Sequence, residues 1–297
     1  MELYQLRSFT TIAEVGNFTH AAKALATTQP TLSQQIINLE KELGQRLFHR
    51  LGRRAVLTEA GQVFLDRTRR ILFEVDSARQ EIADHPGMDR RITVGAVPSV
   101  APYMLPPLIA QARIEHPNLD IHIREDFHPA LVQAVLEGEL DLAIVSGPVH
   151  ESALAVEPYI REPLLLVVGE QHPFATREKI LTADLAAETF VMLGSSSLLA
   201  EQVRSFCGDH RFTPRIGYRC AQVATVKTLV ALGVGISILP RSSQSSKDLD
   251  TLVYRKLSDS SPERELQIIR HQQRYQSRGA AQFLGMLKAG VMQPVTH

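Results

Sequence analysis

The stretch AAKALATTQPTLSQQIINLEKELG, residues 21–44, has two short apolar-patterned segments separated by a small, Thr-rich turn. Helices this short are only marginally stable in water, so both segments must pack against a third element. Thr28 suits the N-cap of the second helix, and Pro30 is tolerated in its first turn, where an N–H would have no intrahelical partner. This second helix has an apolar stripe at helical spacing, formed by Leu32, Ile36, Leu39 and Leu43.

The third element lies directly upstream, where apolar residues recur at helical spacing from Leu3 to Ile12. Gly16 ends this helix, and Asn17 is a suitable cap for a following helix from about Phe18 to Leu25. Three short helices with one polar face left over indicate a helix-turn-helix, whose second helix enters the major groove of DNA. The polar face consists of Thr28, Gln29, Pro30, Thr31, Ser33 and Gln34.

Glutamine and serine side chains hydrogen-bond base edges, and threonines contact phosphate or a thymine methyl group. Seen alone, however, a polar helix face is usually just solvated, so the neighbouring residues decide between the two interpretations. The next segment, QRLFHRLGRRAVLTEAG, places a glycine turn between alternating apolar residues and predicts a two-stranded wing. Its guanidinium groups suit phosphates and narrow minor grooves, which favours DNA binding. The arginines of this segment are Arg46, Arg50, Arg53 and Arg54.

A long helix follows the wing, with Thr58 as its cap and Glu59 near the positive end of its dipole. It carries a heptad-like apolar stripe, a pattern that usually pairs with another helix. We expect this stripe to hold a dimer together; packing on its own domain is the alternative. The stripe consists of Phe64, Ile71, Val75, Ala78 and Ile82, and HPGMD, residues 85–89, ends the helix.

Together these segments resemble the winged helix-turn-helix and linker helix of the LysR-type transcriptional regulators. The resemblance rests on LRSFTTIAEVGNFTHAAKALATTQPTLSQQIINLEKELGQRLFHR, on RRAVLTEAG and on the helix that follows. It is specific over about residues 1–66, and the two-domain layout extends it to the whole chain. It implies that the DNA contacts fall on the face of the second helix described above and on Arg50, Arg53 and Arg54 of the wing.

The overall composition is that of an ordinary globular protein. A length of 297 residues is long for one core and predicts two domains plus a connector. Because 32 basic residues balance 32 acidic ones, a DNA-binding patch must be local. No apolar run approaches the about 20 residues that a membrane span needs, and two cysteines are too few for a disulfide scaffold. We therefore expect a soluble, cytoplasmic protein.

From Arg91 onward, strands alternate with single helices, which predicts parallel βαβ units that bind ligands at the carboxyl ends of their strands. Small polar residues end several of these strands, and a serine triplet precedes a helix near Leu198, whose N-terminus suits an anion. Each serine taken singly is as well explained as an ordinary cap. The candidate effector-binding residues are Pro98, Ser99, Val100, Ser146, Gly147, Ser195, Ser196, Ser197, Thr225 and Ser237.

The resemblance implies an α/β fold of periplasmic-binding-protein type for the C-terminal half, with two lobes and two crossover strands. It also implies that a small effector enters the cleft, shifts the lobes and changes how a tetramer of the chain bends promoter DNA. The partners would then be double-stranded promoter DNA, a small-molecule effector and further copies of the chain. The expected domains are a winged helix-turn-helix at 1–58, a linker and dimerisation helix at 59–90, and an effector domain at 91–297, with lobe I at 91–161 and 268–297 and lobe II at 162–267.

One branch of the family senses peroxide through a reactive cysteine pair, and LLAEQVRSFCGDHRF and VPSVAPYMLP resemble segments of that branch. Cys207 matches the resolving cysteine, whereas Leu198 occupies the attacking position. Neither leucine nor the adjacent Ser197 supplies a thiolate. We therefore interpret Cys207 and Cys220 as buried and inert. A disulfide between them, in a thiol-based redox-responsive regulator, is the alternative left open here.

No catalytic motif is present: there is no nucleophile elbow, no phosphate loop and no zinc-protease helix. His122 and His128 flank two acidic residues but lack a tight metal-ligand spacing. We therefore expect no enzymatic activity, no metal and no cofactor. Two competing functions are a solute-binding module without DNA function and an enzyme with Ser196 as its nucleophile, for which no base is identified.

Overall fold

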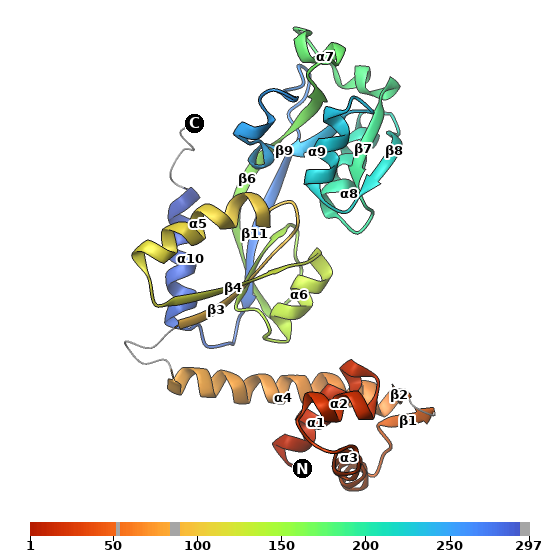
Figure 1. The fold of residues 1–297 in the computed structure, drawn as a ribbon, viewed down its shortest axis with the longest axis vertical. Coiled ribbons are helices and arrows are strands. Elements are labelled where there is room, and N and C mark those ends of the chain that lie inside the picture. Colours follow the sequence, from red (N-terminus) through yellow and green to blue (C-terminus); the bar gives the residue numbers. More distant parts are fainter. Residues whose placement is uncertain (52–53, 84–89, 292–297) are drawn as a thin grey trace. The chain divides into compact units, whose positions relative to one another are not determined.

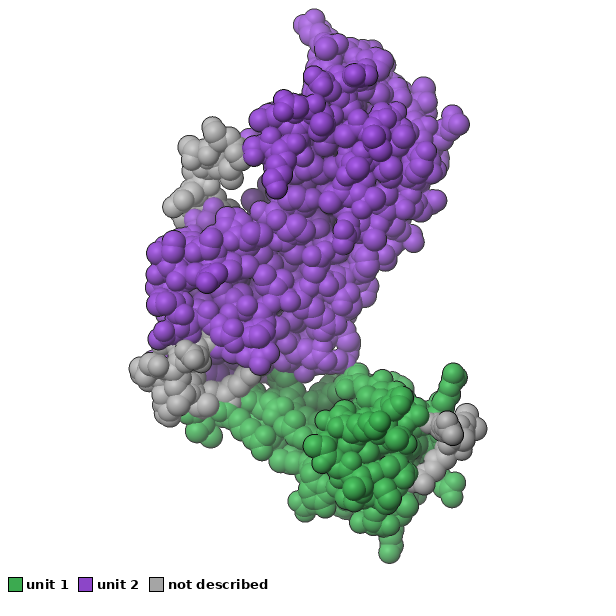
Figure 2. Space-filling model, viewed as in Figure 1, with its two compact units in different colours: residues 1–83 green, residues 84–297 purple. Residues whose placement is uncertain are grey.

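The computed structural model describes residues 1–51, 54–83 and 90–291. The chain forms two compact units, Met1–Ala83 and Asp84–His297 (Figure 2). None of the described helices is both long and apolar enough to cross a membrane.

The first unit consists of four helices and a two-stranded antiparallel wing (Figure 1). Its caps are those that the sequence predicts. The Asn17 side chain accepts hydrogen bonds from the backbone N–H groups of Thr19 and His20, and Gly16 ends the first helix at a left-handed φ of 67°. The elements are α1 (Leu3–Val15), α2 (Phe18–Ala24), α3 (Gln29–Leu43), β1 (Phe48–Leu51), β2 (Arg54–Leu57) and α4 (Glu59–Ala83).

The core of this unit lies where α1, α3 and the start of α4 meet. Leu32, Ile36 and Leu39 are fully buried, as the helical stripe predicts, and the Phe9 ring lies 5.3 Å from that of Phe48. Leu43, which we expected in the same stripe, is exposed. It is the last residue of α3, where the helix has run past the core that buries the other three.

The second unit contains a seven-stranded sheet with the order β10-β6-β11-β5-β3-β4, in which β9 also pairs with β6. Parallel pairing, as expected from the βαβ pattern, joins β3 to β4 and to β5, whereas β6 and β11 run antiparallel to their neighbours. The sheet is therefore mixed. Its strands are β3 (Arg90–Ala96), β4 (Leu119–Glu125), β5 (Leu142–Ser146), β6 (Leu154–Gly169), β9 (Ser237–Pro240), β10 (Leu252–Arg255) and β11 (Glu263–His271).

Two hydrophobic cores divide this unit into lobes. Lobe I is built on β3, β4, β5, β11 and the first part of β6, and it includes α5 (Ala101–Glu115), α6 (His128–Leu136) and α10 (Arg278–Val291). Lobe II is built on the rest of β6 with β9 and β10. Its other elements are α7 (Pro173–Thr176), η1 (Thr182–Ala187), β7 (Thr189–Leu193), α8 (Leu198–Asp209), β8 (Arg215–Cys220), α9 (Val223–Ala231), η2 (Arg241–Ser243) and η3 (Ser246–Asp248).

The long strand β6 passes from one lobe to the other. Residues 154–163 pair with β11 in lobe I, and residues 164–169 pair with β9 and β10 in lobe II. We expected the chain to return to lobe I at residue 268, but β11 already pairs with β6 at Glu263, and Leu266 lies in the lobe I core. The return therefore precedes β11, because the whole of this strand belongs to the lobe I sheet.

Candidate nucleic-acid interface and interlobe pocket

The polar face of α3 begins at its N-cap. The Thr28 hydroxyl accepts a hydrogen bond from the Thr31 backbone N–H at 3.3 Å, and the two hydroxyl oxygens lie 2.8 Å apart. Pro30 occupies the first turn, as the sequence predicts. The structure leaves Thr28, Gln29, Pro30, Thr31 and Gln34 exposed and Ser33 half-buried.

Side chains on this face are held in rows by hydrogen bonds one helical turn apart. Gln29 Nε2 donates to Ser33 Oγ at 2.9 Å, and Gln34 Nε2 donates to Asn38 Oδ1 at the same distance. Such pairs restrict the rotamers of long side chains before any partner arrives. Asn38 was not among the predicted contact residues, although its position four residues after Gln34 is the signal that identifies it.

The wing is fastened to α3 by one carboxylate. Glu40 Oε1 accepts the backbone N–H groups of Leu47 at 2.8 Å and Phe48 at 3.2 Å, so the basic hairpin begins beside the recognition helix. Arg54 is exposed on β2. Arg50 lies on β1, and both its side chain and the whole of Arg53 lie outside the described residues.

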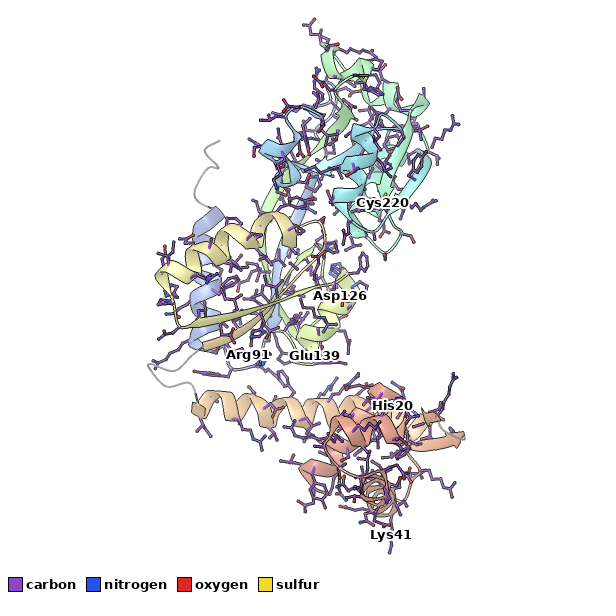
Figure 3. All side chains as sticks on the ribbon, in the orientation of Figure 1. His20, Lys41, Arg91, Asp126, Glu139 and Cys220 are labelled. Carbon is purple, nitrogen blue, oxygen red and sulfur yellow. The ribbon has the colours of Figure 1, made fainter. Side chains whose placement is uncertain are left out.

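Basic residues are found on α3 as well as on the wing. Lys41 is exposed near the end of α3, and Figure 3 shows its side chain directed away from the rest of the unit. Between positions 41 and 54 the sequence has five basic residues and one acidic residue, Glu42. A local basic surface of this kind is the electrostatic requirement for phosphate contacts in a chain with no net charge.

Only part of the apolar stripe on α4 is exposed and available for contact with a second chain. The Phe64 ring lies 5.1 Å from the Phe9 ring and packs on the core of its own unit. We expected Phe64 to contact a second chain; in the single chain its half-buried ring packs against its own unit, because the first turns of α4 close the helix-turn-helix core. Further along, Ile71 and Ala78 are exposed, Val75 is half-buried and Ile82 is 73% exposed.

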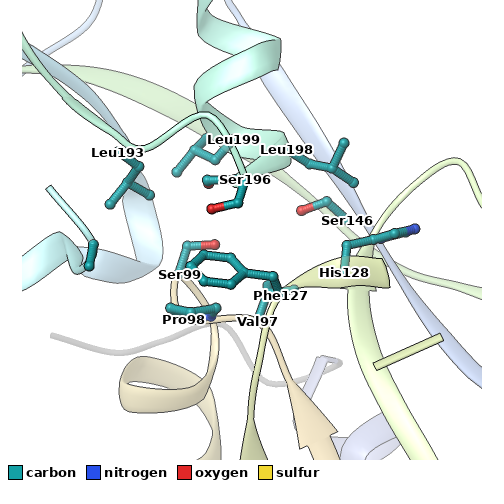
Figure 4. A pocket seen from close by; sticks show the side chains of 12 residues that line it. Val97, Pro98, Ser99, Phe127, His128, Ser146, Leu193, Ser196, Leu198 and Leu199 are labelled. Carbon is teal, nitrogen blue, oxygen red and sulfur yellow. The ribbon is translucent and has the colours of Figure 1, made fainter. Parts of the chain in front are cut away.

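A pocket lies between the two lobes, at the carboxyl ends of β3 and β5 and the N-termini of α6 and α8 (Figure 4). The empty space between its walls is about 320 Å³, including the part open to solvent. Its walls combine hydroxyl groups with apolar side chains. The lining residues are Val97, Pro98, Ser99, Phe127, His128, Ser146, Leu193, Ser196, Ser197, Leu198, Leu199 and Ala221.

Four serines line this pocket with the Phe127 ring, and Figure 4 labels three of them, Ser99, Ser146 and Ser196. Ser99 and Ser146 are almost fully buried, and the Ser99 hydroxyl accepts a hydrogen bond from Arg264 at 2.7 Å. Neither α6 nor α8 has a side-chain cap. First-turn backbone N–H groups therefore face no capping side chain, although Pro129 in the first turn of α6 has no N–H to offer. The pocket therefore offers hydroxyls and amide donors on an apolar floor.

His128 is the titratable residue in the pocket wall. Burial lowers its pKa, and its buried Nδ1 atom has no hydrogen-bond partner. The imidazole is therefore neutral near pH 7 and does not supply a fixed positive charge. Polar recognition in the pocket depends on hydroxyl and backbone groups instead.

Half of the predicted effector residues reach the pocket: Pro98, Ser99, Ser146, Ser196 and Ser197. The others do not line it, for reasons that depend on tertiary packing. Val100 is buried in the lobe I core, and Gly147 donates its N–H to the Glu265 carbonyl. Ser195 and Thr225 are exposed outside the pocket, and Ser237 lines a second, smaller cavity within lobe II.

The prediction missed the apolar walls of the pocket. Phe127 and His128 follow β4 directly, so the rule that ligands bind beyond the carboxyl ends of strands identifies them. Leu193 ends β7 and satisfies the same rule. Leu198 and Leu199 open α8. Leu198 was singled out only by its match to the attacking position of the peroxide-sensing branch, and no sequence signal separates Leu199 from ordinary core leucines.

Both cysteines are free thiols and both are buried. Burial raises the pKa of Cys207 to about 11 and also raises the pKa of Cys220. A thiol with such a pKa is almost entirely protonated near neutral pH and reacts poorly with peroxide. Leu198, which stands at the attacking position of the peroxide-sensing branch, lines the pocket.

Among the described residues, no group of three or more histidine, cysteine, aspartate or glutamate side chains is arranged to hold a metal ion. His122 is paired instead with Asp120, at 2.8 Å on an exposed strand.

Comparison with known proteins agrees with this architecture. Residues 3–62 match the model of the bacterial regulatory helix-turn-helix protein, lysR family, and residues 85–291 match the LysR substrate binding domain. The DNA-binding transcriptional dual regulator OxyR of Escherichia coli is 32% identical over 272 residues, which cover 91% of this chain and 89% of that relative. The HTH-type transcriptional regulator AlsR of Bacillus subtilis is 32% identical over 261 residues, 86% of each chain. A solved full-length OxyR variant from Pseudomonas aeruginosa has a TM-score of 0.76 at 26% identity, covering 99% of this chain and 96% of its own.

A winged helix-turn-helix followed by a two-lobed ligand-binding module defines a DNA-binding regulator under the control of a small molecule. The chain belongs to the LysR family of bacterial transcriptional regulators. It is a sequence-specific DNA-binding protein with an effector-binding domain.

Proposed function

We propose that the exposed face of α3 reads base edges in promoter DNA while the wing arginines and Lys41 contact phosphates. The remaining α4 stripe, formed by Ile71, Val75, Ala78 and Ile82, pairs with a second copy of the chain. A small molecule bound in the interlobe pocket then sets the activity of the regulator. The protein acts in the cytoplasm and catalyses no reaction.

One observation carries the DNA-binding assignment: the ordered polar rows on α3 lie beside a basic wing that Glu40 fastens in place. A merely solvated helix needs neither preorganised glutamines nor an adjacent arginine hairpin. A solute-binding module without DNA function needs neither feature, so the same observation disfavours that alternative. Family membership supports the interpretation independently.

The test uses the full-length chain and duplexes selected by it from a random library. We expect Gln29→Ala to lose about 1–3 kcal/mol of discrimination at one base pair, because an amide contact to a base edge is removed. Arg54→Ala is expected to weaken binding to all sequences alike, because a phosphate contact carries no base information. Fluorescence anisotropy titrations on matched and single-substituted duplexes measure both effects.

A matched control is Gln111→Ala on α5, because Gln111 makes a similar hydrogen bond to Glu115 four residues on, in the other unit of the chain. It should leave base preference and affinity unchanged. Unaltered sequence preference in Gln29→Ala, together with unaltered affinity in Arg54→Ala, would show that another surface binds DNA.

A further inference from the structure

Two opposite charges are buried at the junction of the lobes. Arg264 is 1% exposed and Glu162 is 5% exposed, and they are paired opposite each other on the antiparallel strands β11 and β6. Arg264 Nε donates to Glu162 Oε1 at 2.7 Å. One residue beyond Glu162, pairing of β6 with β11 ends, and Leu164 pairs with β9 of lobe II. The ion pair therefore joins both crossover strands where they leave lobe I.

The remaining hydrogen bonds of this pair reach into both lobes. Arg264 donates from Nη1 to the Ser99 hydroxyl at 2.7 Å and from Nη2 to the Ser99 carbonyl at 3.1 Å. Ser99 belongs to lobe I and lines the interlobe pocket. On the other side, Glu162 Oε2 accepts the backbone N–H of Ser242, in η2 of lobe II, at 3.1 Å. We call the connected set Ser99, Arg264, Glu162 and Ser242 the interlobe relay.

Stability alone is a weak explanation for this arrangement. Burying two charges removes their hydration, and replacement of a buried ion pair by uncharged residues is often neutral for folding. What the guanidinium supplies is geometry, because its planar fork donates to the carboxylate and to Ser99 at the same time. A lysine is a point charge on a flexible stem and does not reproduce that fork.

We propose that Arg264 is a positioning residue that couples the Ser99 wall of the pocket to the angle between the lobes. A molecule that competes for the Ser99 hydroxyl weakens the hydrogen bond from the Arg264 guanidinium to Ser99. The resulting shift of Arg264 moves Glu162, which is hydrogen-bonded to η2 of lobe II. The inference rests on the proposed function in taking this pocket as the effector site. Its test needs no effector and no DNA, so its failure is distinguishable from failure of the DNA-binding assignment.

The test measures the distance between the lobes in the full-length chain by electron double resonance. Nitroxides are attached at Gln133→Cys on α6 and at Leu232→Cys after α9, both exposed positions, while the native cysteines are buried. Dilution with unlabelled chain isolates the distance within one molecule. The relay variants are Ser99→Ala and the double replacement Arg264→Met with Glu162→Gln, which keeps an acceptor for the Ser242 N–H.

We expect the double replacement to broaden the interlobe distance distribution by about twofold, because both crossover strands lose their shared anchor at a hinge. Ser99→Ala is expected to broaden it less, since the Ser99 carbonyl still binds Arg264. In the double-replacement background, Ser99→Ala should add nothing, because the two changes break one connected set. Arg264→Lys should resemble the double replacement rather than the native chain.

Two control variants separate coupling from general damage. Ser146→Ala removes another buried pocket hydroxyl that lies outside the relay. Arg274→Met removes a largely buried arginine whose ion pair with Asp141 lies within lobe I. Both should keep the native distance distribution. A native distance distribution in the double replacement overturns the proposal. If the double replacement does not fold, a native distribution in Ser99→Ala overturns it. Broadening of the same size in both controls also overturns it.

Discussion

Single residues decide which chemistry this member of the family has available. Cys207 is buried in the lobe II core. The sequence resemblance to the peroxide-sensing branch places Leu198 at the position of the attacking cysteine. The thiol has neither the exposure nor the low pKa that a redox sensor needs. The thiol-based alternative therefore has no support in the structure.

The raised pKa of Cys207, about 11, predicts an inert thiol at neutral pH. At pH 8 about one molecule in a thousand carries the thiolate, so iodoacetamide should leave the native chain unmodified by intact mass. Reaction should quicken as the pH rises toward 11, because the thiolate fraction grows. In denaturant, where the thiol has its ordinary pKa, both cysteines should alkylate readily. Rapid labelling of Cys207 in native protein at pH 8 contradicts this account.

The raised pKa of Cys207 also determines how its contribution to folding stability depends on pH. The unfolded thiol ionises near pH 9, and the folded thiol ionises near pH 11, so the unfolded state releases its proton first. The contribution of Cys207 to folding is therefore fully present below pH 9 and is lost as the pH rises from 9 to 11.

At the scale of elements, the start of α4 is fixed by close packing. The Gly61 N–H donates to the Thr58 hydroxyl at 2.9 Å, and a Cβ built on Gly61 would lie 2.1 Å from the Leu47 carbonyl oxygen. The wing and the long helix can approach this closely only because residue 61 has no side chain. The same close approach brings Phe64, three residues later, onto the core of its own unit.

Gly61→Ala should therefore destabilise the first unit by about 1–3 kcal/mol, because backbone must shift to admit the methyl group. Urea unfolding followed by circular dichroism measures the change in the free energy of unfolding. Gly285→Ala on α10 is the matched control, since an added Cβ there meets nothing within 4 Å. That control should be neutral or stabilising by up to about 1 kcal/mol, as alanine favours helix. Equal stability of the two variants would exclude the steric explanation.

The exposed part of the α4 stripe makes a prediction about assembly. Replacing Ile71 and Ile82 together by glutamate places charge at the centre of the expected helix pair, so the dimer should dissociate to monomers in light scattering. Val63→Glu, a change at an equally exposed apolar position outside the stripe, should leave the assembly intact. An unchanged mass for the double variant would assign assembly to another surface.

At the scale of the whole molecule, zero net charge hides a strongly local basic surface. DNA affinity should fall linearly on logarithmic axes as salt rises, because phosphate contacts release counterions. Arg54→Ala should reduce the slope by about 0.9 for each phosphate that the variant no longer neutralises. Arg113→Ala, which removes an exposed arginine on α5, should leave the slope unchanged. Equal slopes for native and Arg54→Ala chains would remove the wing from the interface.

The pocket shows which site residues can be predicted from the sequence and which require the tertiary structure. Ser99 and Ser146 were predictable because Ser146 ends β5 and Ser99 follows closely after β3, and parallel strands bring their carboxyl ends to one edge. Thr225 and Ser195 carry similar local signals, yet the fold turns both to solvent. The Arg264–Glu162 pair had no signal at all, since its partners are separated by about a hundred residues.

The sequence by itself determined the winged helix-turn-helix, its caps, the exposed polar face of α3 and the α/β character of the C-terminal half. These follow from periodicity, capping and composition within short windows, where local physical chemistry dominates. Only the tertiary structure decided that Phe64 packs inward, that β11 belongs to lobe I, and that Arg264 links Ser99 to the crossover strands. Each of these depends on burial between segments far apart in the chain, which no local pattern specifies.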